Sequence, residues 1–71
     1  MIHRKLKIGV IGLGVGEQHV IGYQQIPNLE VTDICDTDPS VLQIVGDRND
    51  VPHRHHNYTP MTENPNIDIV S

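Results

Sequence analysis

Apolar residues along the chain gather in short clusters separated by turn-forming and polar residues. The first cluster, Leu6–Ile11, is nearly continuous, as in parallel strands that are buried on both faces. Leu29–Cys35 and Ile67–Ser71 have the same character, and the polar run His53–Tyr58 is a weaker strand candidate between them. The segments between these clusters have the composition of helices and turns, so the pattern predicts a parallel sheet.

The first helix is expected over Glu17–Ile26, directly after a run of glycines. Val20 and Tyr23 fall on one face at helical spacing and predict the side that packs on the sheet. Gly22 would allow this helix to approach the sheet closely. Pro27 follows the helix and ends it.

The second helix has a clear start, with Asp38 as a suitable N-cap and Pro39 at the first helical position. Gly46 indicates its end. Thr59, followed by proline, predicts the cap of a turn or short helix before the last strand. The full order is strand, helix, strand, helix, strand, short helix, strand. It predicts an α/β fold with an incomplete, Rossmann-like parallel sheet and right-handed crossovers.

Three glycines, Gly12, Gly14 and Gly16, lie between the first strand and the first helix. A glycine-rich turn that leads from a parallel strand into a helix makes an anion site, because backbone N–H groups and the helix dipole both favour negative charge there. Gly12 and Gly14 match the first two positions of the dinucleotide pattern G-x-G-x-x-G. The third position is Glu17, and Gly16 stands one residue early.

The second strand ends in Asp36, where a carboxylate can accept hydrogen bonds from both hydroxyls of an adenosine ribose. Asp38 adds a second negative charge nearby, which would repel a 2′-phosphate and favours NAD over NADP. A structural alternative remains open, in which the glycines only shape a strand–helix corner and Asp36 caps the next helix.

These residues resemble the Gfo/Idh/MocA oxidoreductases over most of the chain, from Lys5 to Ser71. "KIGVIGLG" is similar to that family's opening strand and turn, "LEVTDICDTDPS" to its second strand, and "NPNIDIVS" to the stretch before its fourth strand. His19 is similar to a histidine in the family's first helix. The chain departs from the family in a glycine turn that is one residue shorter and in Asp33, where a small or apolar residue is usual.

The resemblance implies that residues 1–71 are the N-terminal part of a dinucleotide-binding Rossmann domain, and that a C-terminal substrate domain is absent from this chain. It implies NAD as the cofactor, hydride transfer on a sugar or polyol substrate, and a homo-oligomer at full length. The family's catalytic Lys would lie beyond Ser71, so no residue here is assigned as catalytic. The implied cofactor-binding residues are Gly12, Leu13, Gly14, Val15, Gly16, Asp36 and Ser71.

Two rival functions remain open from the residues. S-adenosylmethionine methyltransferases carry G-x-G-x-G, which "GLGVG" matches, but they usually have an acidic residue where this chain has Val10. The other rival is a non-catalytic module that binds a nucleotide as a sensor. A Lys-containing catalytic segment in the gene after Ser71 would favour the oxidoreductase.

Charge and cysteine content narrow the remaining classes. The net charge of −4 provides no basic face for nucleic acid and no polybasic patch for a membrane. The single Cys35 excludes an internal disulfide, fits a cytoplasmic location, and is expected to pack in the core. No stretch is long enough to span a bilayer.

A cluster of histidines, His53, His55 and His56, could be considered for zinc. A polar edge or loop is the favoured interpretation, and no metal site is assigned. The chain ends in or just after a strand that nothing covers. We therefore expect the 71-residue chain alone to be inactive and marginally stable.

Overall fold

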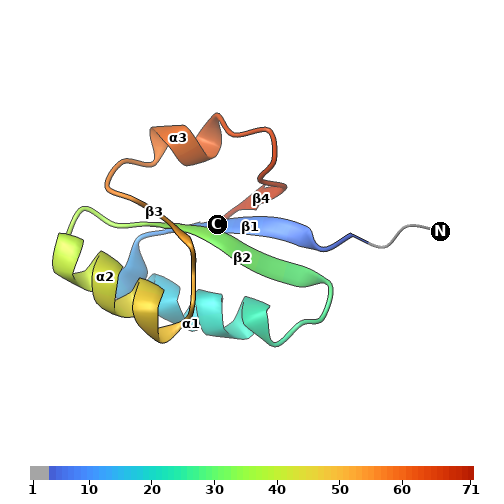
Figure 1. The fold of residues 1–71 in the computed structure, drawn as a ribbon, viewed down its shortest axis with the longest axis horizontal. Coiled ribbons are helices and arrows are strands. Elements are labelled where there is room, and N and C mark those ends of the chain that lie inside the picture. The colour runs from blue at the N-terminus through green and yellow to red at the C-terminus, as the bar shows by residue number, and fades with distance from the viewer. Residues whose placement is uncertain (1–3) are drawn as a thin grey trace.

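The computed structural model describes residues 4–71, which form a parallel four-stranded sheet with helices on both faces (Figure 1). The strands are β1 (Leu6–Ile11), β2 (Leu29–Cys35), β3 (His53–His55) and β4 (Ile69–Val70), arranged in the order β3-β2-β1-β4. All three pairings are parallel. The predicted Rossmann-like α/β fold is confirmed.

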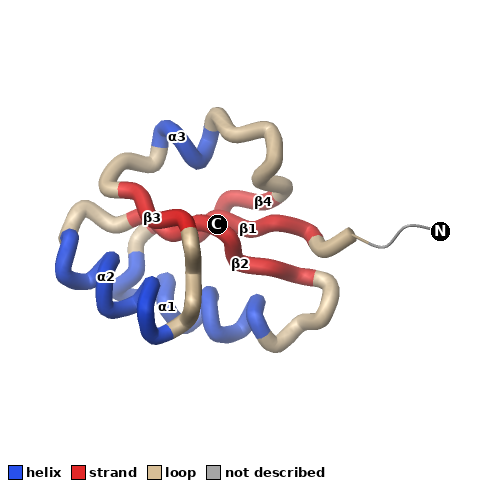
Figure 2. The backbone as a smooth tube through the Cα atoms, in the orientation of Figure 1, coloured by secondary structure: helices blue, strands red, loops and turns tan. Residues whose placement is uncertain are grey.

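The helices are α1 (Leu13–Gln24), α2 (Pro39–Arg48) and the single turn α3 (Thr59–Thr62). Figure 2 shows α1 and α2 together on one side of the strands and α3 on the other. Each of β1, β2 and β3 is therefore followed by a crossover that returns the chain to the amino-terminal edge of the sheet, as parallel pairing requires. The carboxyl ends of all four strands meet at the opposite edge.

The core lies between the sheet and the pair of helices α1 and α2. Its buried members come from β1, β2, α1, α2 and the segment after α2, and are Ile8, Val10, Leu13, Val20, Val31, Ile34, Leu42, Val45 and Val51. On the opposite face Met61 is 1% exposed and lies against Gly9, where an added Cβ would come within 2.5 Å of the methionine methyl. Gly9 is thus the position that lets α3 pack directly on β1.

The ends of the strands are less buried than the first prediction required. Leu6 and Ile11 are 40% and 37% exposed, so β1 is covered on both faces only in its middle. The last strand is shorter than predicted, and Ile69 and Val70 are 41% and 42% exposed. These residues form the outer edge of the sheet, where β1 is their only paired neighbour within the described residues.

The boundaries of α1 differ from the prediction. The helix begins at Leu13 rather than Glu17, because helical geometry takes in the glycines instead of stopping before them. Gly22 does not face the sheet: it is exposed and has open space around it, so its predicted packing role was wrong. Gly16 takes that role, since a Cβ there would lie 3.2 Å from Val10 Cγ1.

The second helix starts as predicted and ends later. The Asp38 carboxylate accepts hydrogen bonds from the backbone N–H groups of Ser40 at 2.9 Å and Val41 at 3.4 Å, which confirms the N-cap. Gly46 does not end the helix. It is a buried interior position whose missing side chain makes room for the guanidinium of Arg54.

The cap of α3 was also placed one residue too late. The N-cap position belongs to Tyr58, and the Thr59 backbone N–H donates to the side-chain oxygen of Asn57 at 2.9 Å. Asn57 therefore performs the side-chain capping that was expected of Thr59.

Candidate functional site

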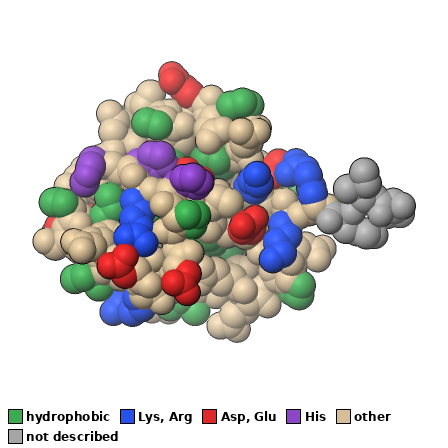
Figure 3. All heavy atoms as spheres, viewed as in Figure 1, with side chains coloured by type: hydrophobic (Ala, Val, Ile, Leu, Met, Phe, Trp, Pro, Cys, Tyr) green, Lys and Arg blue, Asp and Glu red, His purple; other side chains and the backbone are tan. Residues whose placement is uncertain are grey.

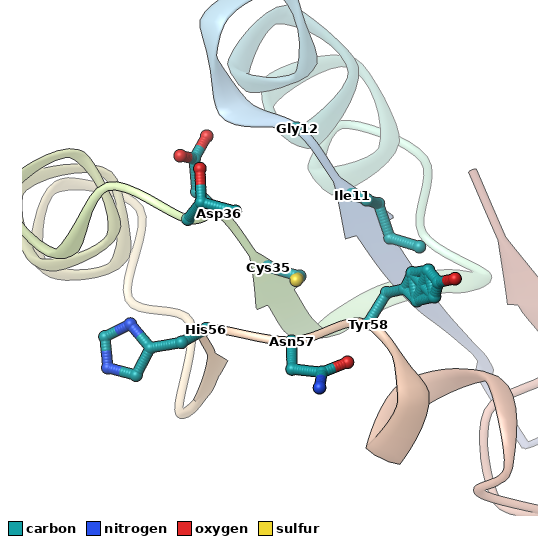
Figure 4. Close-up of a pocket in the computed structure, with 8 residues that line it drawn as sticks. Ile11, Gly12, Cys35, Asp36, His56, Asn57 and Tyr58 are labelled. Atoms are coloured by element: carbon teal, nitrogen blue, oxygen red, sulfur yellow. The ribbon is translucent and has the colours of Figure 1, made fainter.

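A cavity of about 390 Å³ opens at the edge where the carboxyl ends of the strands meet. Its lining comes from the ends of β1 and β2 and from the segment that follows β3, and consists of Ile11, Gly12, Cys35, Asp36, Thr37, His56, Asn57 and Tyr58 (Figure 4). In open parallel sheets, ligands bind at this edge, outside the carboxyl ends of the strands. The cavity is therefore the candidate site.

Gly12 forms the sharp turn between β1 and α1. Its φ of 80° and ψ of 102° are accessible to glycine and strained for other residues. Its backbone N–H donates to the Cys35 carbonyl at 2.9 Å, which fixes the turn against the end of β2. The sequence prediction of a glycine-dependent turn at this position is confirmed by the backbone.

The first turn of α1 has two backbone N–H groups that are available to a ligand. A helix leaves the N–H groups of its N-cap and first three residues without intrahelical partners. Here Gly12 donates to Cys35, and Leu13 donates to Asp36 Oδ2 at 2.8 Å. Within residues 4–71, Gly14 and Val15 have no such partner outside the helix, and a Cβ at Gly14 would meet nothing within 4 Å.

Asp36 joins the glycine turn to the start of the second crossover. One carboxylate oxygen accepts from the Leu13 N–H and the other from the Asp38 N–H, both at 2.8 Å. These backbone bonds, that from Asp38 first and that from Leu13 second, lower the pKa of Asp36. The Thr37 backbone lowers the pKa of Asp36 further, so the carboxylate is ionised at neutral pH, and it has acceptor capacity beyond these bonds.

The structure gives Asp36 a structural role, although Asp38 and not Asp36 caps α2, and the ribose contact stays a prediction. The carboxylate does tie down backbone amides, as a structural residue would. It does so while lining the cavity, at a position where a ribose hydroxyl could reach its remaining lone pairs. The carboxylate of Asp38, by contrast, caps the N-terminus of α2.

Ser71 lies on the other side of the glycine turn from Asp36. Its backbone carbonyl accepts from the Ile11 N–H at 2.9 Å, which extends the β1–β4 ladder to the carboxyl edge. Its hydroxyl lies 3.2 Å from the Tyr23 hydroxyl of α1. Gly12 thus stands between the strand ends that carry Asp36 and Ser71, and Ser71 is not part of the cavity lining.

Glu17 stands where the dinucleotide pattern has its third glycine. Its carboxylate binds Arg48 of α2 in a bidentate pair at 2.6 and 2.8 Å, and it also accepts from the Asn49 side chain at 2.9 Å. These bonds, that from Arg48 first, lower the pKa of Glu17. Glu17 therefore links the two helices and is turned away from the glycine turn.

The sequence predictions did not assign His56–Tyr58, the segment after β3 that lines the cavity, to the site. In Figure 4 the ring of Tyr58 and the side chain of Ile11 face the same space, with the sulfur of Cys35 beside them. The missed indication was the strand order: β3 neighbours β2, so residues after β3 must border Asp36.

Cys35 is 4% exposed, and burial, followed by the neighbouring Asp36 charge, raises the pKa of its thiol. This agrees with the predicted packing role, although its sulfur also borders the cavity. His19 lies on the exposed side of α1, with its ring centroid 6.4 Å from that of Tyr23.

Histidine side chains gather near β3 on the face seen in Figure 3, with acidic and basic side chains around them. No group of three or more His, Cys, Asp or Glu side chains in residues 4–71 has the geometry to hold a metal ion. Over the same residues, no helix has both the length and the apolar character needed to cross a membrane.

Solved structures share this fold closely. A probable dehydrogenase from Thermotoga maritima is 30% identical, with a TM-score of 0.87 over 92% of this chain and 20% of that one. The WlbA dehydrogenase from Chromobacterium violaceum, crystallised with NADH and UDP-GlcNAcA, is 26% identical, with a TM-score of 0.83 over 99% and 21%.

The myo-inositol dehydrogenase from Lactobacillus casei, crystallised with NAD(H) and myo-inositol, is 25% identical, with a TM-score of 0.84 over 93% and 20%. The chain thus spans about a fifth of the length of these proteins. No curated protein matches the chain significantly.

These comparisons do not favour the methyltransferase or the non-catalytic module. The profile of the oxidoreductase family with an NAD-binding Rossmann fold, Gfo/Idh/MocA, matches residues 6–71, which is nearly the whole chain. This confirms the family that the sequence motifs resemble and the cofactor that they imply. The chain belongs to the Gfo/Idh/MocA oxidoreductase family and carries its NAD-binding Rossmann fold.

Proposed function

We propose that residues 1–71 are the N-terminal part of the dinucleotide-binding domain of an NAD-dependent oxidoreductase that acts on a CH–OH group of a sugar or polyol. The substrate class is supported by the similar structures, which were crystallised with a cyclic polyol and with a nucleotide sugar. No residue of this part is assigned a catalytic role, and the group that moves the substrate proton is proposed to lie in a separate substrate domain.

The proposed cofactor-binding residues have different roles toward the cofactor. The N–H groups of Gly14 and Val15 donate to the pyrophosphate at the positive end of α1, and the bare Gly14 backbone allows the close approach. Gly12 and Leu13 hold the turn in place through their bonds to β2 and Asp36. When bound, NAD supplies the carbon that accepts or donates the hydride.

Gly16 and Ser71 shape the same cofactor site without donating to the pyrophosphate. Gly16 lets α1 lie close to β1, so the free amides are held at a fixed height above the strand end. Ser71 ends the β1–β4 ladder beside the turn, on the side opposite Asp36. We assign it to the nicotinamide side of the cofactor on that basis.

The observation that carries the proposal is the position of Asp36 at the cavity, ionised and with acceptor capacity left over. Its carboxylate accepts from the ribose hydroxyls, and its charge repels a 2′-phosphate. The apolar surfaces of Ile11, Cys35 and Tyr58 offer the adenine a place to pack. We further propose a cytoplasmic location and a homo-oligomer, on the grounds of the single cysteine and the family.

Calorimetric titration of the full-length protein with NAD, NADP and S-adenosylmethionine tests the proposal. We expect NAD to bind more tightly than NADP, and S-adenosylmethionine not to bind. Asp36→Asn should weaken NAD binding by about 1–3 kcal/mol, the scale of a hydrogen bond to a charged group, and narrow the gap to NADP. Asp38→Asn is the matched control, since it removes the same charge but keeps a capping side chain.

Asp38 lies outside the cavity lining and caps α2, so the control should leave the ratio of NAD to NADP affinity nearly unchanged, in contrast to the role that the sequence suggested for its charge. An unchanged ratio in Asp36→Asn would sink the assignment of Asp36. Tight binding of S-adenosylmethionine without NAD would replace the oxidoreductase with the methyltransferase.

A further inference from the structure

A partly buried side-chain contact crosses from β2 to the edge strand β3. His55 Nε2 lies 2.8 Å from Asp33 Oδ2, and the second carboxylate oxygen accepts from the Thr32 hydroxyl at 2.6 Å. The Asp33 side chain is only 6% exposed and that of His55 is 24% exposed. Asp33 is the position at which the sequence departs from the small or apolar residue usual in the family.

A carboxylate in this position is costly unless it is paired, since burial removes its hydration. Both oxygens of Asp33 do have partners, so the cost is offset only while His55 and Thr32 stay in place. The β1–β2 register shifts between Ile8 and Gly9, so Asp33 stands opposite Gly9. The contact therefore holds His55 to a fixed point on β2.

Apart from this contact, β3 is held by Arg54, which donates to the Val51 carbonyl at 2.9 Å and to Asp47 Oδ1 at 2.6 Å. The strand itself adds little more. It is three residues long, lies at the edge of the sheet, and pairs only with β2 within residues 4–71. Its last residue, His55, stands opposite Cys35, and its carbonyl accepts from the Asp36 N–H at 3.1 Å. A displacement of His55 would thus reach the backbone of Asp36 and the following cavity wall, His56–Tyr58.

We propose that Asp33 and His55 form a positioning pair for the adenosine half of the cofactor. The side-chain contact locks the end of β3, and the end of β3 sets both the cavity wall and the backbone of Asp36. The nicotinamide half lies on the other side of the glycine turn and is not reached by this chain of contacts. The inference rests on the proposed placement of the adenosine at Asp36.

The test compares His55→Asn with His55→Gln in the full-length protein. A glutamine amide nitrogen can occupy the place of Nε2 and donate to Asp33, whereas the shorter asparagine has the same chemistry but cannot reach. His53→Asn is the matched control, because His53 is an exposed residue of the same strand with no side-chain hydrogen bond within residues 4–71.

Two ligands distinguish a specific effect on the adenosine site from a general loss of stability. ADP-ribose carries the adenosine, and reduced nicotinamide mononucleotide does not. We expect His55→Asn to weaken ADP-ribose binding about tenfold, equivalent to the loss of one weak contact, and to leave the mononucleotide within about twofold. His55→Gln and His53→Asn should stay within about twofold of the wild type for both ligands.

Equal weakening of both ligands by His55→Asn would show a merely structural pair, and equal ADP-ribose affinity in all variants would show no coupling. Each result overturns the inference. A wild-type protein that binds neither ADP-ribose nor NAD would instead refute the proposed function, and the inference with it.

A measurement on the wild type covers the case in which His55→Asn does not fold. Long-range ¹H–¹⁵N spectra report the imidazole nitrogens, and we expect a protonated His55 Nε2 whose resonance shifts on saturation with ADP-ribose. The His53 resonances should not shift. A His55 resonance that is unaffected by ADP-ribose would overturn the proposal without any variant.

Discussion

Gly14→Ala should affect folding and cofactor binding in opposite directions. Gly14 lies in the first turn of α1, its φ lies outside the left-handed region, and an added Cβ meets nothing within 4 Å. Alanine is favoured over glycine in helices by about 0.5–1 kcal/mol. With no clash to offset this gain, the variant should be more stable than the wild type by up to about 1 kcal/mol.

The same methyl group should weaken NAD binding. It would project from the helix beside the free N–H groups of Gly14 and Val15, where the pyrophosphate is proposed to lie. Losing one hydrogen bond to a charged group costs about 1.5–3 kcal/mol, which corresponds to about a 10- to 150-fold rise in the dissociation constant. A single substitution that stabilises the protein and weakens NAD binding is difficult to explain by damage to the fold.

Gly22→Ala provides the control within the same helix. Gly22 is also helical, exposed and free of neighbours within 4 Å, so its stability gain should be similar. It lies far along α1 from the turn, so NAD affinity should not change. Urea unfolding measures the stability of each variant, and calorimetry measures NAD affinity. Equal NAD affinity in Gly14→Ala and Gly22→Ala would refute the placement of the pyrophosphate over the first turn.

Two further predictions concern the backbone of the turn and the edge of the sheet. Gly12→Ala forces a side chain into φ 80° and should lower the free energy of unfolding by about 1–3 kcal/mol, measured in urea; an unchanged value would show that the turn relaxes freely. The Arg4 guanidinium and the Lys7 backbone N–H lower the pKa of Asp68 from 3.8 to about 2. The stabilisation from this pair should be fully present above pH 4 and lost as the pH falls through about 2. The difference in the free energy of unfolding between the wild type and Asp68→Asn, measured in urea, should therefore shrink between pH 5 and pH 2. A constant difference would contradict the pairing.

The sequence allowed the sheet and its crossovers to be predicted because local chemistry decides them. The apolar runs that became β1 and β2 have no competing helical pattern, and Asp38 with Pro39 defines a helix start on its own. Gly12 and Asp36 were predicted for the same reason, since a strand end and a glycine turn are visible within a few residues.

The missed features depend on contacts between distant segments. Gly46 was taken as a helix end because glycine commonly stands there, but its role is set by Arg54, which only the fold brings close. Tyr58 could not be assigned to the cavity until the strand order placed β3 beside β2. The partner of Asp33 likewise follows from the register of β3 and not from any motif.

The glycine that stands one residue early shows how the motif can shift without losing the site. Close approach of α1 to β1 requires a bare position on the stripe that faces the sheet, and that stripe carries the buried Leu13, Gly16 and Val20 at spacings of three and four. The usual third glycine, one residue later, would lie within the same inward-facing arc, because residues three and four positions after Leu13 both fall close to its face of the helix. Moving the glycine to position 16 frees position 17 for a side chain, and Glu17 uses it to bind Arg48 of α2. The requirement at this turn is therefore geometric, a gap against Val10, and the exact spacing of the motif is one of at least two ways to provide it.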